Sequence, residues 1–218
     1  MPVPDPSSRE PLAEVLARLF AGPPEDRIAV ADIVAKLHGR SWPLLIAVFV
    51  FPNCVPTGIP WLSTITGIPI VLLVLQMILR RQTPALPGFI ARGTVPLDRL
   101  QRLARRSRRT LDWLERVVKP RHAGATSGLA GGCVKAALLA NAVILALPIP
   151  FDNLFPAWAL LLFALALLER DGLMALAGWV LTVVTLAWTA LLLTVYRDAP
   201  GLVWSWVKAG WQALAGGA

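Results

Sequence analysis

Hydrophobic residues in this chain gather into long runs, and four of these runs form two pairs. The first pair is 42–51 and 65–79, and the second is 133–147 and 157–168. Within each pair, a short segment rich in proline and asparagine separates the two members. Each run is shorter than the ~20 apolar residues that a helix needs to cross a bilayer. The pattern therefore predicts two hairpins, in each of which an apolar helix stops, turns and resumes.

Prolines and glycines dominate the two predicted breaks. Proline removes a backbone donor and blocks the helix behind it, so one long helix cannot continue through either segment. We assign this structural role to Pro52, Pro56, Gly58, Pro60, Pro69, Pro148, Pro150 and Pro156. The motif Asn-x-x-Pro occurs in both breaks, at 53–56 and 153–156, which indicates an internal repeat. The pattern does not decide whether the breaks turn back inside the membrane or reach its outer face.

The rest of the chain is predicted to be helical as well. Residues 173–196 form the one uninterrupted apolar run that is long enough to span a membrane alone. The tryptophans of residues 201–218 predict a surface or shallow re-entrant helix, because tryptophan prefers the membrane interface. The predicted fold class is an all-α polytopic membrane protein. Its expected parts are amphipathic cytoplasmic helices (1–40), a first hairpin (41–82), a basic connector (83–132) with a flexible lead-in at 124–132, a second hairpin (133–172), and a spanning helix with a Trp-rich end (173–218).

Composition supports a membrane protein. Hydrophobic residues make up 56% of the chain, and charged residues make up only 16%, against about 25% in soluble domains. The net charge of +8 does not indicate nucleic-acid binding, because most basic residues lie at 80–121, beside the apolar runs. Basic loops of this kind mark the cytoplasmic side and contact anionic lipid head groups. The first residues match no signal-peptide pattern, so we expect them to stay in the cytoplasm.

The arginines of the connector have two interpretations. Arg102, Arg105, Arg106, Arg108 and Arg109 crowd one face of a predicted helix. That face either binds an anionic polymer or lipid, or belongs to a structural connector whose side chains extend into the head groups. The second interpretation is favoured.

The sequence lacks motifs for catalysis. It has no His-Glu-x-x-His, no glycine-rich phosphate loop and no Gly-x-Ser-x-Gly. His38 and His122 are far apart in sequence, and Cys54 and Cys133 lack the spacing of metal ligands. We therefore predict no catalytic residue, no metal, no cofactor and no disulfide framework.

The candidate site consists of polar residues embedded in the two breaks. Asn53, Asp152 and Asn153 lie in apolar surroundings, where an unpaired polar group costs several kcal/mol. Broken segments at matching positions of two repeats are a sequence signal of a transporter's binding site. Ser63 and Thr64 either add hydroxyls to this site or cap the returning helix. In the competing structural interpretation, the two asparagines cap helices and Asp152 lies in interfacial water.

The two breaks resemble the signatures of a known family. Residues 52–69 are similar to the first signature of the ExoD exopolysaccharide-synthesis proteins. Residues 148–157, together with Leu-Glu-Arg-Asp-Gly at 168–172, are similar to the second, and the resemblance covers roughly residues 10–200. It implies a multi-pass protein of the bacterial inner membrane, linked to exopolysaccharide production and to tolerance of alkaline conditions. The family resemblance does not fix a molecular activity.

Three classes of function follow from these observations. The leading hypothesis is a non-enzymatic, transport-related protein that binds an ion or a lipid-linked sugar in a pocket at the two breaks. The alternative is an envelope scaffold or accessory protein of exopolysaccharide synthesis, whose breaks are structural. The missing motifs disfavour an enzyme that acts on a lipid-linked sugar. We also expect a homodimer, because a chain of this size encloses little space.

Overall fold

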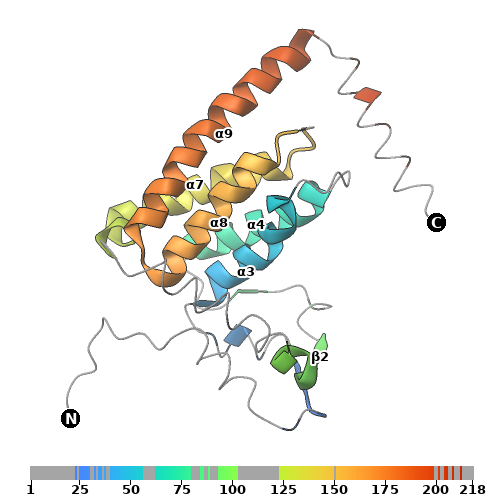
Figure 1. Cartoon of the computed structure of the whole chain (residues 1–218), viewed down its shortest axis with the longest axis vertical. Helices are drawn as coiled ribbons and strands as arrows, with labels where there is room; N and C mark the ends of the chain where they lie inside the picture. Colours follow the sequence, from blue (N-terminus) through green and yellow to red (C-terminus); the bar gives the residue numbers. More distant parts are fainter. Residues whose placement is uncertain are drawn as a thin grey trace.

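The first hairpin is built from two helices joined through a short 3-10 helix in the computed structural model (Figure 1). Helix α3 (Ser41–Val50) continues directly into η2 (Phe51–Cys54), and α4 (Leu62–Ile78) follows. The structure describes residues 23, 25–29, 32, 34–35, 37, 40–55, 62–79, 84–85, 88, 93–102, 123–149, 151–198, 201, 204–205, 208 and 212. The two predicted helices of this hairpin are therefore confirmed, and the part of the break at 56–61 lies outside the described residues.

The second hairpin repeats this arrangement with a different connection. The short helix η3 (Ala123–Thr126) precedes α7 (Gly128–Ala146), and α8 (Leu154–Glu169) follows after a connection without helix. Helix α7 begins earlier than the sequence predicts, so the expectation of a flexible lead-in through residue 132 is wrong. Gly131 permits this first turn, because a Cβ atom there would lie 2.6 Å from the carbonyl oxygen of Thr126, and the packing of the remainder of α7 stabilises it.

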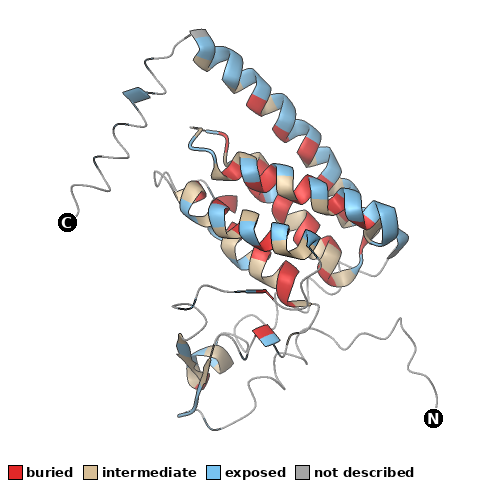
Figure 2. Cartoon of the chain, turned by 180° about the vertical axis from the view of Figure 1, so that it is seen from behind, coloured by how far each residue is buried: buried red, intermediate tan, exposed pale blue. Residues whose placement is uncertain are grey.

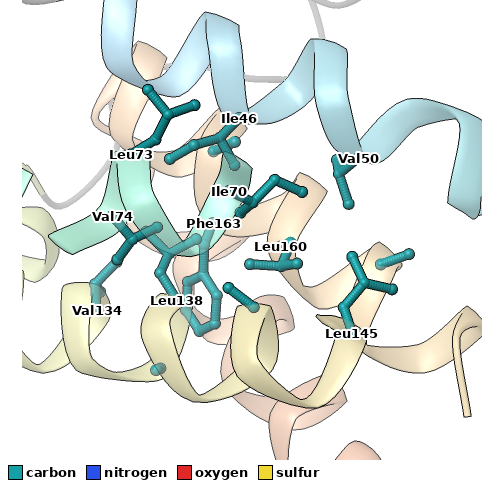
Figure 3. Close-up of a cluster of buried hydrophobic side chains, with 14 of the residues drawn as sticks. Ile46, Val50, Ile70, Leu73, Val74, Val134, Leu138, Leu145, Leu160 and Phe163 are labelled. Carbon is teal, nitrogen blue, oxygen red and sulfur yellow. The ribbon is translucent and has the colours of Figure 1, made fainter. Parts of the chain in front are cut away.

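The two hairpins pack against each other. Helix α3 lies against α8, and α4 lies against α7, while the two helices within each hairpin also touch. The core lies between these four helices (Figure 3), where side chains from all of them point toward one another. Its largest fully buried apolar members are Ile46, Val50, Ile70, Val74, Val134, Leu138, Leu145, Leu160 and Phe163.

Two glycines set the distance between helices. A Cβ atom on Gly67 of α4 would lie 2.7 Å from the backbone Cα of Ala146 in α7. A Cβ atom on Gly178 would lie 2.8 Å from the ring of Phe163. Real Cβ atoms do not approach other atoms this closely, so both contacts require glycine. Interfaces between membrane helices use small residues for the same purpose.

The C-terminal part of the last long helix extends beyond the bundle (Figure 1). Helix α9 (Gly172–Asp198) has 27 residues, packs mainly against α8, and matches the predicted uninterrupted apolar run. It starts after a tight polar turn in which Arg170 has a left-handed φ of 55°. The Oδ1 atom of Asp171 accepts the backbone N–H of Leu173 at 2.8 Å. Exposed residues dominate the far half of α9 (Figure 2).

The mostly helical fold confirms the predicted all-α class, with one addition. Strands β1 (Arg27–Ala29) and β2 (Thr94–Pro96) form a two-stranded antiparallel sheet. The Arg27 side chain donates to the hydroxyl of Thr94 at 2.9 Å, and it also donates to the Thr94 carbonyl at 3.1 Å. The sequence analysis missed this sheet because strands of three residues carry too little periodic signal.

Several sequence predictions concern residues outside the described part of the chain. The amphipathic helix within residues 8–20 lies wholly outside it, and most of the arginine face of the connector does as well. Arg102 is described, and it forms an ion pair with Asp98 one helical turn earlier. Only scattered residues of the Trp-rich segment 201–218 are described, so the predicted surface helix stays a prediction.

Candidate functional site

The breaks of the two hairpins lie at the same end of the bundle. The indole Nε1 of Trp158, in the second turn of α8, donates to the backbone carbonyl of Cys54 in η2 at 3.1 Å. This hydrogen bond joins the first break to the second hairpin. The polar residues of both breaks are therefore gathered around one end of the bundle.

Asn53 is buried and has a partner within its own hairpin. Its Nδ2 donates to the hydroxyl of Thr66 in α4 at 2.7 Å. That hydroxyl in turn donates to the carbonyl of Leu62 at 2.8 Å. Asn53 therefore connects the break to the returning helix through a chain of side-chain hydrogen bonds. The structural interpretation expected Asn53 to stabilise the hairpin by capping a helix. The side chain instead bonds to the side chain of Thr66.

Asp152 is buried between the second break and α9. It is 1% exposed, and the hydroxyl of Thr189 lies 3.0 Å from its Oδ1 and 2.9 Å from its Oδ2. Next to it, Trp188 donates its indole N–H to the carbonyl of Phe151 at 3.0 Å. The Trp188 ring also packs edge-on against Phe155, with ring centroids 5.7 Å apart. Aromatic residues thus lie beside the second break, while the contact of the Asp152 carboxyl itself is with Thr189.

The carboxyl of Asp152 has no ion-pair partner among the described residues. Lys135 lies near the far end of α7, and Glu169 is the last residue of α8, so both are remote from the break. The described titratable group that interacts electrostatically with Asp152 is Tyr196 of α9. A buried carboxyl without a counter-charge is costly, which makes this position the strongest candidate for a function.

Asn153 occupies the N-cap position of α8 but makes no side-chain capping hydrogen bond. The competing structural interpretation, in which its side chain caps the returning helix, therefore does not hold for Asn153. Its Oδ1 atom is buried without a hydrogen-bond partner among the described residues. The hydroxyl of Thr64 is likewise buried and has no partner among them. Ser63 is buried, and its carbonyl accepts a hydrogen bond from Thr66 at 3.3 Å. The candidate hydroxyls thus lie in the returning limb of the first hairpin.

The predicted helix breaks have different outcomes. Pro52 occupies the first turn of η2, and Pro148 lies in the connection after α7. Pro69 lies inside α4, so its assignment as a break is wrong; membrane helices tolerate proline where neighbouring groups satisfy the freed backbone. Pro156 lies in the first turn of α8, where a missing N–H costs little, so it starts a helix and does not break one. Pro56, Gly58, Pro60 and Pro150 lie outside the described residues.

The structure does not join all the predicted site residues in one contact. Asn53 binds Thr66 of α4, whereas Asp152 binds Thr189 of α9. The sequence analysis missed the second partner, because the apolar run of α9 hides a buried polar face made of Thr182, Thr185 and Thr189. Their spacing of three and four residues was the available signal, since such residues share one side of a helix.

A second polar contact, also unpredicted, lies on the same face of α9, nearer the start of that helix. Asn141 of α7 is fully buried, and its Nδ2 donates to the hydroxyl of Thr182 at 2.9 Å and to the carbonyl of Ala137 at 2.8 Å. Its Oδ1 has no partner among the described residues. Asn141 therefore fastens α7 to α9 between the break and the start of α9.

The described residues contain no group of three or more His, Cys, Asp or Glu side chains that would hold a metal ion. Cys54 is buried and Cys133 is exposed, and both are free thiols. The chemistry of the site is therefore that of one carboxyl, amides and hydroxyls within an apolar bundle.

These features define a class of helical protein with apolar helices and a buried acidic break. Helices α7 and α9 are long and apolar enough to cross a membrane. The chain belongs to the ExoD family, because the family model described as "Exopolysaccharide synthesis, ExoD" matches residues 12–191. This result confirms the resemblance drawn from the two breaks.

Two curated relatives resemble the chain over most of its length. Protein ExoD of Rhizobium meliloti is 30% identical over 189 residues, which are 85% of this chain and 78% of the relative. An uncharacterised protein of Synechocystis is 25% identical over 163 residues, covering 73% of this chain and 77% of the relative. No solved structure matches the chain.

Proposed function

We propose that this chain is a multi-pass protein of the bacterial inner membrane that acts in exopolysaccharide synthesis by moving a small polar or ionic solute. The family description and the name of the Rhizobium relative support the link to exopolysaccharide. Both relatives come from bacteria. The two membrane-length helices and the exposed apolar side chains of the bundle support the location.

Helix length supports re-entrant hairpins. Helices α4, α7 and α8 have 17, 19 and 16 residues, or about 24–29 Å at 1.5 Å per residue. The hydrocarbon core is ~30 Å thick. In this arrangement, both breaks lie inside the bilayer, short of its far face, while α9 crosses completely. The basic residues of 80–121 then lie on the cytoplasmic side.

One observation carries the transport proposal: the buried carboxyl of Asp152 at the second break, bonded to Thr189 and without a described counter-charge. An ionisable group inside the membrane is costly to maintain and marks a solute pathway by default. The buried free acceptor of Asn153, the next residue, adds a polar atom to the same break. The recurring motif at residues 53–56 and 153–156, with the crossed packing of the two hairpins, supports an internal repeat around this site.

The proposed protein is not an enzyme and needs no cofactor. Its site offers one carboxyl, amides and the hydroxyls of Ser63 and Thr64, a set of groups that binds polar solutes. No catalytic motif accompanies them in the sequence. Turnover of a lipid-linked sugar by the purified protein would contradict this part of the proposal.

Flux measurements in reconstituted vesicles test the transport proposal. Asp152→Asn and Asn153→Ala should abolish the flux of a solute that the parent protein moves, while the protein stays folded. Asn53→Ala should also reduce it, through the loss of the contact with Thr66. The matched control is Thr194→Val, which changes an exposed hydroxyl bonded only within α9. Unchanged flux in Asp152→Asn contradicts the proposal, as does a parent protein that moves neither ions nor sugar lipids.

A scaffold or accessory role in exopolysaccharide synthesis is the second candidate. The observation that favours it is the well-satisfied first break, where Asn53 and the carbonyl of Cys54 both have protein partners. A scaffold would keep its function in Asp152→Asn. It would lose partner pull-down when the arginines from Arg102 to Arg109 are neutralised.

We further propose that anionic lipids bind this arginine face and that the chain forms a homodimer. Crowded arginines beside a membrane helix attract anionic head groups at about 1 kcal/mol per residue. A second copy would cover polar backbone at the breaks that lipid cannot satisfy. Mass measurement of the protein in lipid nanodiscs tests the oligomeric state.

A further inference from the structure

The threonines on the buried face of α9 do not all bond in the same way. The hydroxyls of Thr182 and Thr185 each donate to the backbone carbonyl four residues earlier, at 2.8 Å in both cases. Buried threonines in helices commonly satisfy themselves through this bond. The hydroxyl of Thr189 bonds to the carboxyl of Asp152 instead. The carbonyl of Thr185, four residues earlier in α9, is the corresponding intrahelical acceptor for Thr189, which in this structure donates to the carboxylate instead.

The enclosure of Asp152 limits the size of what can bind there. The side chain is 1% exposed. The indole of Trp188 donates to the carbonyl of Phe151 and packs against Phe155 beside the break. A sugar head group does not fit beside the carboxyl without the separation of α9 from the break. The ligand class is therefore reduced to a proton or a bare metal cation.

The available oxygen atoms decide between these two ligands. Hard metal cations take about six or more oxygen ligands. The described oxygens in contact at this position are the two carboxylate oxygens of Asp152 and the hydroxyl of Thr189. The nearby carbonyl of Phe151 already accepts the N–H of Trp188. A proton needs only one of these oxygens, whereas a hard metal cation would have to recruit at least about three more, so the hydrogen-bonded set favours a proton.

We infer that Asp152 and Thr189 form a proton-binding site that fastens the second break to α9 in one protonation state and loosens it in the other. A proton from the aqueous phase forms an O–H bond with the carboxylate and cancels its charge, and the same proton returns to water on release. In the protonated state, the acid donates to the hydroxyl of Thr189, and that hydroxyl donates to the carbonyl of Thr185. The hydrogen bond from Thr189 to the carboxylate is lost as these two form, and no covalent bond other than the carboxyl O–H forms or breaks.

The charge on Asp152 determines how firmly the break is held. A hydrogen bond to a carboxylate is roughly twice as strong as one between neutral groups. Of the described titratable groups, Tyr196 of α9 is the one that interacts electrostatically with Asp152, and the charged residues of α7 and α8 lie toward the far ends of those helices. Protonation thus weakens a contact between the break and the membrane-length helix. The inference rests on the proposed function for its place in transport, although proton binding itself requires no flux.

Infrared difference spectroscopy of the full chain in lipid nanodiscs tests the site. The spectrum between mildly acidic and alkaline buffer should contain the C=O band of one buried protonated carboxyl. Asp152→Asn should remove this band. Thr189→Val should keep the band but move its frequency, because the hydroxyl partner is gone, while the matched variant Thr185→Val should leave the frequency unchanged. If Asp152→Asn fails to fold, a band that Thr189→Val leaves unmoved still overturns the site.

Two further measurements separate this inference from the transport proposal and from metal binding. Replacing potassium by sodium at constant pH should leave the carboxyl band intact, and its loss would show a metal cation in place of the proton. A titrating Asp152 band in a protein without flux contradicts transport and leaves the proton site standing. If the parent protein shows flux that Asp152→Asn abolishes, but the carboxyl band survives in Asp152→Asn, the proton site is contradicted and transport is left standing.

Discussion

At the scale of single residues, small side chains determine which helices can touch. Gly67 allows α4 to approach the backbone of Ala146 in α7, where even one methyl group would overlap at 2.7 Å. The neighbouring atoms belong to the backbone, so relief requires movement of a whole helix. By contrast, a methyl group added at Gly132, on the exposed side of α7, would have no neighbouring atom within 4 Å among the described residues.

Gly67→Ala is expected to destabilise the protein by about 1–3 kcal/mol, the usual cost of overpacking a tight interface. The matched control, Gly132→Ala, should be neutral or stabilising by up to ~1 kcal/mol, because alanine is the better helix former. Reversible unfolding in mixed detergent micelles measures both free energies. Equal effects of the two substitutions would contradict the close contact between α4 and α7.

The contact between Asn53 and Thr66 is expected to contribute about 0.5–1.5 kcal/mol of coupling energy, the range of a net hydrogen bond. A double-mutant cycle with Asn53→Ala, Thr66→Val and the double variant isolates this value from the other effects of each change. Strictly additive losses would show that the two side chains do not interact, and would make the amide of Asn53 available to a solute.

Sequence patterns predict the polar residues of the breaks but not their partners. Asn53 and Asp152 are recognisable because polar side chains interrupt apolar runs. Thr66 and Thr189 are not, since threonine is common in membrane helices and its partner depends on which helices meet. The pairs Asn53–Thr66 and Asp152–Thr189 join residues 13 and 37 positions apart, and the local periodicity carries no information on them. The same limit explains why the sequence predicts a break at Pro69, although surrounding helices keep α4 intact.

At the scale of elements, α9 is held to the bundle by a few polar contacts on an otherwise apolar helix. Its face toward the bundle carries Gly178, Thr182, Thr185 and Thr189, spaced three or four residues apart. Asn141 binds the second of these and Asp152 the last. The boundaries of α9 could be predicted from its uninterrupted apolar run, whereas this face could be recognised only by asking which threonines share a side.

Thr182→Val is expected to weaken the attachment of α9, because it removes the hydroxyl partner of the buried Asn141. Hydrogen bonds between membrane helices contribute about 0.6 kcal/mol on average and up to about 1.7, so the loss should lie in this range. Hydrogen exchange of the α9 amides reports the change where it occurs. Thr194→Val, with its exposed intrahelical bond, should change exchange little. Equal protection in the two variants would contradict the role given to Asn141.

At the scale of the whole molecule, the bundle and α9 differ in length, and this difference places the breaks. Thr189 lies level with Asp152, because the two side chains are bonded. From Gly172 to Thr189, α9 rises about 25 Å at 1.5 Å per residue, and the nine residues that follow add about 14 Å. If α9 spans the bilayer from Gly172 to Asp198, the second break cannot reach the far surface. The exposed apolar residues Leu191, Leu193 and Val195 beyond the break then face lipid.

Spin labels at single cysteines test this depth directly. Cys54 and Cys133 are first replaced by alanine, and labels are then placed at Arg170, Phe151 and Arg197, all of which are exposed. The label at Phe151 should lie about 10 Å deeper in the bilayer than the label at Arg197, since the helical rise separates their levels. The labels at Arg170 and Arg197 should report opposite surfaces and serve as references within the same molecule. A label at Phe151 that is as accessible to water-soluble quenchers as the one at Arg197 would place the break at the surface. The hairpins would then cross the membrane at a thinned position, and Asp152 would lose the apolar surroundings on which the proposed site depends.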